Sequence, residues 1–280
     1  MTDLQKRILD IFREVRDILD RNGITYFAIG GTCIGAVRHG GFIPWDDDLD
    51  IAVPIEQFGR MLDLLKAELP PHLELYTGAE RKHYRYIFVK VTDNRTTFIE
   101  KTEIGYPDAY KGVFIDIMPI SGVLPDKRFY SRIKRYFSMN VRRRFEKGEG
   151  GSSFVRHAAR WAAAHLPVRY SFFSDRYMAF LAEHPFEGAE YTGYVWWSEP
   201  EKLTFPKRFF AETVELPFED TVMKCPAGYD GYLTAQFGNY MEYPPEKDRE
   251  AHHYALVRTD VPYGYYKDNP GRVREDYRDE

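Results

Sequence analysis

The 280-residue chain is 44% hydrophobic and 29% charged, proportions that exclude a disordered, collagenous or coiled-coil protein. Its 39 basic and 43 acidic residues leave a net charge of −4, so we expect no nucleic-acid partner. Two cysteines are too few for a disulfide framework or a zinc cluster, and no run of eighteen apolar residues exists to cross a membrane. No apolar export segment follows Met1, which predicts a cytoplasmic protein of one or two domains.

Helix and strand signals alternate through the first part of the chain. Helical spacing of apolar residues covers three segments: the first twenty or so residues, residues 32–38, and the stretch opened by Pro54. Short β-rich runs cover five others: residues 25–29, 48–53, 84–91, 96–100 and 113–118. Gly30-Gly31 is expected to form a turn, and Pro119 to end the last strand. These elements predict an α+β fold, with a mixed β-sheet core flanked by helices.

Composition divides the chain into four parts: residues 1–125, 126–190, 191–258 and 259–280. The first part carries the sheet, and the second changes to helical spacing, which predicts a helical insert with a loop at 146–153. The third part mixes aromatic residues with prolines and predicts short strands and a helix at 227–237, which complete the core. The last part is a polar tail that we expect to be loosely held.

The densest signal in the chain is acidic. Asp46, Asp47, Asp48 and Asp50 stand within five positions, where the chain enters an apolar strand. Because side chains alternate along a strand, Asp46, Asp48 and Asp50 can point the same way. Such hard oxygen ligands suit Mg²⁺, or Mn²⁺, with substrate phosphate completing the shell. The alternative is a solvated acidic turn, the usual fate of a run of charges.

Asp116 is a single charge inside the apolar run from Val113 to Met118. A carboxylate is rarely buried in such a strand unless it is paired or binds a metal, so we expect it to face Asp48 and Asp50 from a neighbouring strand. It could be a third metal ligand or the general base that takes a proton from an attacking hydroxyl. The alternative is a residue exposed at a sheet edge.

The glycine pair predicts a binding site for an anion. Gly30-Gly31, followed by Thr32 at the start of a helix, would let backbone N–H groups approach a phosphate closely. Arg38, one or two helical turns later, could reach the same anion. An ordinary turn and a surface arginine are the alternatives.

A family resemblance rests on these residues. The stretch from Gly30 to Val53 reads GGTCIGAVRHGGFIPWDDDLDIAV and resembles the signature of the LicD family, which also includes fukutin and fukutin-related protein. Further segments agree: residues 90–97, 113–119, 216–220 and 237–245, and the pair His252-His253. The resemblance spans about residues 20–255 and is weakest over the helical insert. It implies a nucleotidyltransferase-like fold.

The resemblance also implies an activity. Members of the family use a CDP-activated alcohol, such as CDP-choline or CDP-ribitol, and move the phospho-alcohol to a sugar hydroxyl of a cell-surface glycan, releasing CMP. We expect the same Mg²⁺-dependent transfer here, with phosphocholine as the leading candidate and a glycan or lipid-linked glycan as acceptor.

The family's roles carry over by motif. Asp48, Asp50 and Asp116 would hold the metal, Asp46 would support them, and Asp116 or Asp46 would act as the base. The expected contacts to phosphate or acceptor are Gly30, Gly31, Thr32, Arg38, Lys90, Arg95, His252 and His253. For Lys90 and Arg95 an ordinary charge on the strand surface remains the alternative, and for the histidine pair an ordinary helix surface.

Two other functions stay open at this stage. The first is a true nucleotidyltransferase that uses a nucleoside triphosphate and attacks at the α-phosphorus. The second is a non-catalytic glycan-binding module on the same fold, which the intact acids at 48, 50 and 116 argue against.

Two weaker patterns concern partners. The basic, aromatic segment 128–147 could lie on an anionic membrane surface, which would place the protein at the inner face of the membrane. An amphipathic helix packed on the core is the favoured alternative. Trp196, Trp197, Tyr240 and Tyr243 could form an aromatic cage for choline, although core packing is favoured for these too.

Overall fold

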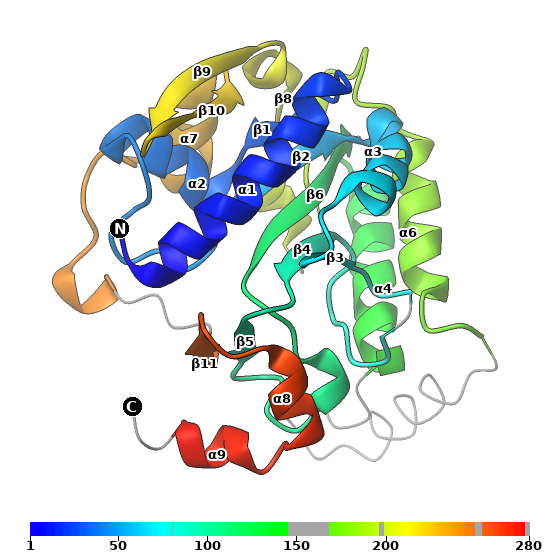
Figure 1. Cartoon of the computed structure of the whole chain (residues 1–280). Helices are drawn as coiled ribbons and strands as arrows, with labels where there is room; N and C mark the ends of the chain where they lie inside the picture. The colour runs from blue at the N-terminus through cyan, green and yellow to red at the C-terminus, as the bar shows by residue number, and fades with distance from the viewer. Residues whose placement is uncertain (80, 145–167, 196–198, 250–253, 278–280) are drawn as a thin grey trace.

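The computed structural model describes residues 1–79, 81–144, 168–195, 199–249 and 254–277 (Figure 1). Five strands build the central sheet, in the order β1 (Phe27–Ala28), β2 (Asp50–Pro54), β6 (Phe114–Gly122), β4 (Val89–Asp93) and β3 (Leu73–Tyr76). β2 and β6 run parallel, whereas the other neighbours in this order are antiparallel. The far end of β6 also pairs with β7 (Tyr191–Gly193), which pairs with β8 (Thr204–Pro206). This mixed sheet with its helices confirms the predicted α+β fold.

Helix α1 (Asp3–Arg21) begins with a capping box. The Thr2 hydroxyl accepts a hydrogen bond from the Gln5 N–H, and the Gln5 side chain accepts one from the Thr2 N–H. The helix buries apolar residues at the predicted three- and four-residue spacing, and it lies across the sheet next to α3 (Ile55–Glu68) (Figure 1).

The basic segment forms α4 (Lys127–Arg144), which lies beside α6 (Phe172–Ala182) (Figure 1). Phe129 and Ile133 face the core, and the buried Arg144 donates to the carbonyl oxygens of Gly78 and Arg81 at 2.8 and 2.7 Å. Six cations of the helix are exposed: Lys127, Arg128, Arg132, Lys134, Arg135 and Arg142. The favoured interpretation, an amphipathic helix packed on the core by one face, agrees with these contacts. Contact with a membrane stays a prediction. Residues 145–147 of the basic segment lie outside the described part of the chain.

The remaining elements are short. A hairpin joins β9 (Thr213–Phe218) to β10 (Thr221–Pro226), and α7 (Tyr229–Phe237) packs against α2 (Gly30–Ile34). Single helical turns occupy η2 (Pro107–Ala109), η3 (Pro200–Leu203), η4 (Lys207–Phe210) and η5 (Glu246–Asp248). Among the described helices none is both long enough and apolar enough to cross a membrane.

Several element boundaries differ from the prediction. β6 does not end at Pro119 but continues to Gly122, because Pro119 lies beyond Ile117, where the pairing of β4 with β6 ends. β3 had no sequence signal that we recognised, and β4 begins only at Val89, since the chain before it is irregular. The glycine pair is not a separate turn: α2 starts at Gly30 and continues into the π-helical segment η1 (Gly35–His39).

Residues 259–277 of the C-terminal tail are ordered, contrary to our prediction. α8 (Tyr263–Asp268) and α9 (Arg272–Asp276) pack beside β5 (Thr97–Glu100) and β11 (Tyr254–Arg258) (Figure 1). A second apolar cluster holds them: Ile99, Tyr110, Leu256, Tyr266 and Val273. Burial of Tyr266 and Val273 stabilises the two helices, although most residues of this segment are polar. The loop predicted at 146–153 lies outside the described residues, and the division into four parts stays a prediction.

Candidate active site

A row of charged side chains crosses the central sheet. In the β2–β6 register Asp50 lies opposite Asp116, and in the β4–β6 register Lys90 lies opposite the same Asp116. Because neighbouring strands are about 4.8 Å apart, the three side chains leave the sheet side by side. Asp93 faces the other way and pairs with Arg7 of α1, with 3.7 Å between Nη1 and Oδ2. The row therefore lies on the face of the sheet away from α1.

Lys90 and Asp116 form a buried ion pair. Lys90 Nζ lies 2.7 and 2.9 Å from the two carboxylate oxygens of Asp116, and the lysine side chain is only 2% exposed. The ammonium also lies over the ring of Phe114, 3.6 Å from its centroid, and over that of Tyr86, at 4.6 Å. These contacts hold the cation at the level of the carboxylates.

Of the two carboxylates in the row, Asp50 has the less favourable surroundings. Its Oδ1 is enclosed and has no hydrogen-bond partner among the described residues. Burial raises the pKa of Asp50 well above its ordinary value, and the charges of Asp48 and Asp116 raise it further. Burial also raises the pKa of Asp116 to about 6, although Lys90 opposes the shift. Carboxylates that repel one another in this way, and titrate together, are stabilised by a divalent cation.

The acidic loop before β2 stands next to the row. One carboxylate oxygen from each of Asp46, Asp47 and Asp48 lies within 4.8 Å of the other two. The amide of Gln5 in α1 holds this loop by donating to the carbonyl oxygens of Ile43 and Asp46 at 3.1 and 3.0 Å. Helix α1 therefore holds the acidic loop in position, although the helix lies on the other side of the sheet from the row.

The glycine pair and Thr32 shape the same cluster from α2. A Cβ on Gly31 would lie 2.8 Å from Asp46 Oδ2, so only glycine leaves room for that carboxylate. Gly30 has a φ of +55°, which favours glycine, and lies against Asp50. The Thr32 hydroxyl accepts a hydrogen bond from the Asp50 N–H at 2.8 Å. These three residues position the carboxylates, which the sequence alone did not predict.

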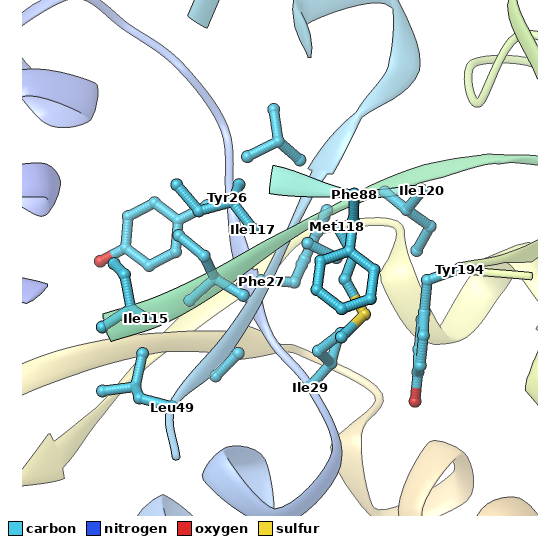
Figure 2. Close-up of a cluster of buried hydrophobic side chains, with 14 of the residues drawn as sticks. Tyr26, Phe27, Ile29, Leu49, Phe88, Ile115, Ile117, Met118, Ile120 and Tyr194 are labelled. Carbon is cyan, nitrogen blue, oxygen red and sulfur yellow. The ribbon is translucent and has the colours of Figure 1, made fainter. Parts of the chain in front are cut away.

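The row and part of the loop form one wall of a cavity of about 640 Å³. Its acidic wall consists of Asp47, Asp48, Asp50 and Asp116. Its apolar floor includes Ile29, Phe88, Met118 and Tyr194, which gather on one side of β6 in Figure 2. η3 and α7 also contribute residues to the lining. The volume is that of a site for a small-molecule substrate.

Comparison with known proteins places this arrangement in a family. The family described as LicD/FKTN/FKRP, nucleotidyltransferase domain, matches residues 23–121. The lipopolysaccharide cholinephosphotransferase LicD of Haemophilus influenzae is 30% identical over 256 residues, which cover 88% of this chain and 92% of that protein. The chain belongs to the LicD family. A shorter match, 41% identical over 56 residues, covers 20% of this chain and 11% of the human ribitol 5-phosphate transferase FKRP.

Membership in the LicD family confirms the resemblance and the enzyme class. The chain is an enzyme that transfers phosphate-containing groups. The family match at 23–121 contains α2, the acidic loop, β2, β4 and all of β6 except Gly122, and therefore every residue of the charged row.

Two arginines expected at the phosphates lie elsewhere in this LicD-family chain. Arg38 donates to the carbonyl oxygens of Tyr240 and Glu242 at 2.6 and 3.2 Å and lies over the ring of Tyr243. Arg95 stands at the turn after β4 and bonds Asp93 at 2.8 Å, on the side of the sheet that faces α1. Neither lines the cavity, because nearer acceptors already hold each guanidinium. His252 and His253 lie outside the described residues.

The predicted aromatic cage does not form from its described members. Tyr240 and Tyr243 pack near Arg38 and His39 instead of lining the cavity, and Trp196 and Trp197 lie outside the described residues. The cavity has other aromatic walls that we did not predict: Tyr86, Phe98, Phe114 and Phe237.

A second buried ion cluster borders the cavity. Glu100 lines it, accepts a hydrogen bond from the Tyr86 hydroxyl at 2.7 Å, and pairs with Lys111 at 3.0 Å. Lys111 also pairs with Glu103 at 2.7 Å. Burial raises the pKa of Glu103 to about 7, and the charge of Glu100 adds to the rise while Lys111 opposes it. The sequence signal for Glu100 was a charge at the end of the apolar run 97–100. It is similar to the signal for Asp116, a charge inside an apolar strand.

Proposed function

We propose that this chain moves a phospho-alcohol, phosphocholine first, from a CDP-activated donor to a sugar hydroxyl of a cell-surface glycan or its lipid-linked precursor. CMP is the other product. The observation that carries the proposal is the row of Asp50, Asp116 and Lys90 beside the acidic loop on the wall of one cavity. The match to a lipopolysaccharide cholinephosphotransferase, over 92% of that protein, supports phosphocholine and a glycan acceptor.

The proposal includes a Mg²⁺ ion, which Mn²⁺ could replace. Asp48, Asp50 and Asp116 would hold it, with Asp46 in support. The unpartnered, enclosed Oδ1 of Asp50 and the raised pKa values of Asp50 and Asp116 fit a cation in this place. A bound Mg²⁺ supplies positive charge that offsets the diphosphate of the donor.

The residues of the chain have separate parts in the proposed transfer. Asp116 or Asp46 takes the proton of the acceptor hydroxyl, and Asp116 is better placed because it lines the cavity whereas Asp46 packs against Gly31. The hydroxyl oxygen bonds to the β-phosphorus, the bond from that phosphorus to the bridging oxygen breaks, and CMP leaves with that oxygen. Lys90 keeps Asp116 ionised and in place.

A second candidate uses the same site with a nucleoside triphosphate. The description of the matched family as a nucleotidyltransferase domain favours it. In that reaction the acceptor attacks the α-phosphorus and pyrophosphate leaves.

One assay separates the two candidates. The enzyme with Mg²⁺ is offered CDP-choline, CDP-ethanolamine, CDP-ribitol, CDP-glycerol and the nucleoside triphosphates, and CMP and pyrophosphate are measured. The proposal predicts that CMP is released from a CDP-alcohol. Turnover should fall by about a hundredfold or more in Asp48→Asn. It should not change in Asp63→Asn, which replaces an exposed aspartate of α3. Pyrophosphate release without CMP would select the second candidate.

The proposed site of action is the cytoplasmic face of the membrane. The exposed cations of α4, which include Arg128 and Arg135, would hold the protein to anionic lipid. Sedimentation with phosphatidylserine vesicles should weaken in Arg128→Glu/Arg135→Glu, and binding equal to that of the wild type would exclude this part of the proposal.

A further inference from the structure

A chain of hydrogen bonds runs from the start of α2 to the cavity. The Gly30 N–H donates to the Tyr232 hydroxyl at 2.7 Å, and the hydroxyls of Tyr232 and Tyr194 are 2.7 Å apart. The Tyr194 hydroxyl lies 2.6 Å from Gln236 Oε1. Both tyrosines are buried, and Gln236 lines the same cavity as Asp48 and Asp50.

The direction of this chain follows from its two ends. A backbone N–H can only donate, so the Tyr232 oxygen accepts from Gly30. Burial raises the pKa of both phenols, so each keeps its proton. If Tyr194 donated to Tyr232, the buried Tyr232 proton would have no acceptor among the described residues. Tyr232 therefore donates to Tyr194, and Tyr194 donates to Gln236 Oε1.

This direction fixes the amide of Gln236. Because Oε1 accepts from Tyr194, the orientation of the amide is set, and the two hydrogens of Nε2 remain available on a residue that lines the cavity. Within the described part of the chain Nε2 has no acceptor. Donors along a hydrogen-bonded chain also polarise one another, which strengthens the last N–H.

We infer that Gln236 is a substrate-binding residue whose Nε2 donates to a phosphoryl oxygen of the donor's diphosphate. The inference rests on the proposed function, since the diphosphate is the anion expected beside Asp48 and Asp50. An anionic oxygen is the strongest acceptor that a neutral amide can meet there. A neutral donor suits this wall, because it adds binding without competing with the cation for the carboxylates. Tyr194 and Tyr232 are positioning residues that act through Gln236.

The test measures binding, so it does not depend on turnover. The affinity of the full chain for CDP in the presence of Mg²⁺ is determined by calorimetry for the wild type, Gln236→Met and Gln236→Glu. Both variants should bind CDP about ten- to a hundredfold more weakly, because Met removes the donor and Glu replaces it with an acceptor. Thr234→Ala, exposed on the same helix, should bind as the wild type does.

The positioning role predicts a smaller effect. In Tyr194→Phe the amide keeps its donors but loses its fixed orientation, so CDP should bind only a few-fold more weakly and KM should rise with kcat little changed. Gln236→Met that binds CDP as tightly as the wild type would overturn the inference and leave the proposed function standing. If Gln236→Met binds CDP more weakly than the wild type does, but the wild type releases no CMP from any donor, the inference is supported and the proposed function is overturned. A wild type that binds no CDP would overturn both.

Discussion

At the scale of single residues, Lys90 allows four carboxylates to share one wall of the cavity. Its Nζ bonds both oxygens of Asp116 and lowers the pKa of Asp50 against the effect of burial. The sequence suggested Lys90 as a possible contact to diphosphate, but its ammonium is already committed to Asp116. In the proposed transfer it would act on substrate only through the charge of that carboxylate.

Lys90→Met tests this assignment. The substitution leaves Asp116 buried and unpaired, so we expect a loss of about 3–5 kcal/mol in the free energy of unfolding, measured with urea. The double variant Lys90→Met/Asp116→Asn should recover part of that stability but no activity. If the single variant unfolds like the wild type, the pair does not stabilise the site.

Gly31→Ala tests the place of Asp46. The new Cβ would lie 2.8 Å from Asp46 Oδ2 and displace that carboxylate, so kcat should fall by about tenfold or more with little change in melting temperature. Gly59→Ala is the matched control, because that glycine is exposed within α3 with no atom near the added methyl, and it should melt slightly higher. Full activity in Gly31→Ala would show that the position of Asp46 does not matter.

At the scale of elements, the Glu100–Lys111–Glu103 cluster fixes β5 to the chain that leads into β6. Burial raises the pKa of Glu103 from 4.5 to about 7, whereas Lys111 and the Tyr86 hydroxyl help to lower that of Glu100 to about 2. The two carboxylates share one lysine and titrate as a unit.

Glu103 makes stability depend on pH. Between about pH 4.5 and 7 the folded protein keeps a proton that the unfolded chain has released, so this contribution to stability falls as pH rises. The free energy of unfolding of the wild type minus that of Glu103→Gln should therefore fall over this range. Melting curves at several pH values measure it, and a difference that does not change with pH would refute the assignment.

The elements also show what a single sequence can predict. Asp50 and Asp116 were visible because a charge inside an apolar strand needs a partner, and their pairing needs only two neighbouring strands. Tyr194, Tyr232 and Gln236 were not visible, since they come from elements far along the chain from Gly30, 202 residues in the case of Tyr232, and carry no local signal.

Competing local partners explain the remaining differences between prediction and structure. Arg38 is spaced correctly for a phosphate, yet the carbonyl of Tyr240 and the ring of Tyr243 hold it away from the cavity. The polar composition after Asp260 hid Tyr266 and Val273, whose burial orders the tail. Such contacts are set by tertiary packing and leave no periodic pattern in the sequence.

At the scale of the whole molecule, α1 and α7 approach the acidic cluster from different parts of the chain. Gln5 of α1 holds the acidic loop from one side, and Tyr232 of α7 holds Gly30 from the other. The sheet between them supplies the row of Asp50, Asp116 and Lys90. The proposed transfer therefore depends on the binding of a divalent cation by these carboxylates.

Binding of Mn²⁺, followed by electron paramagnetic resonance on the full chain without substrate, tests that claim most directly. The wild type and Asp63→Asn should bind the ion with the same affinity, and Asp48→Asn and Asp50→Asn should bind it at least about tenfold more weakly, because each loses a charged oxygen ligand. Mn²⁺ binding that is absent from the wild type, or equal in all four proteins, would show that these carboxylates do not hold the cation.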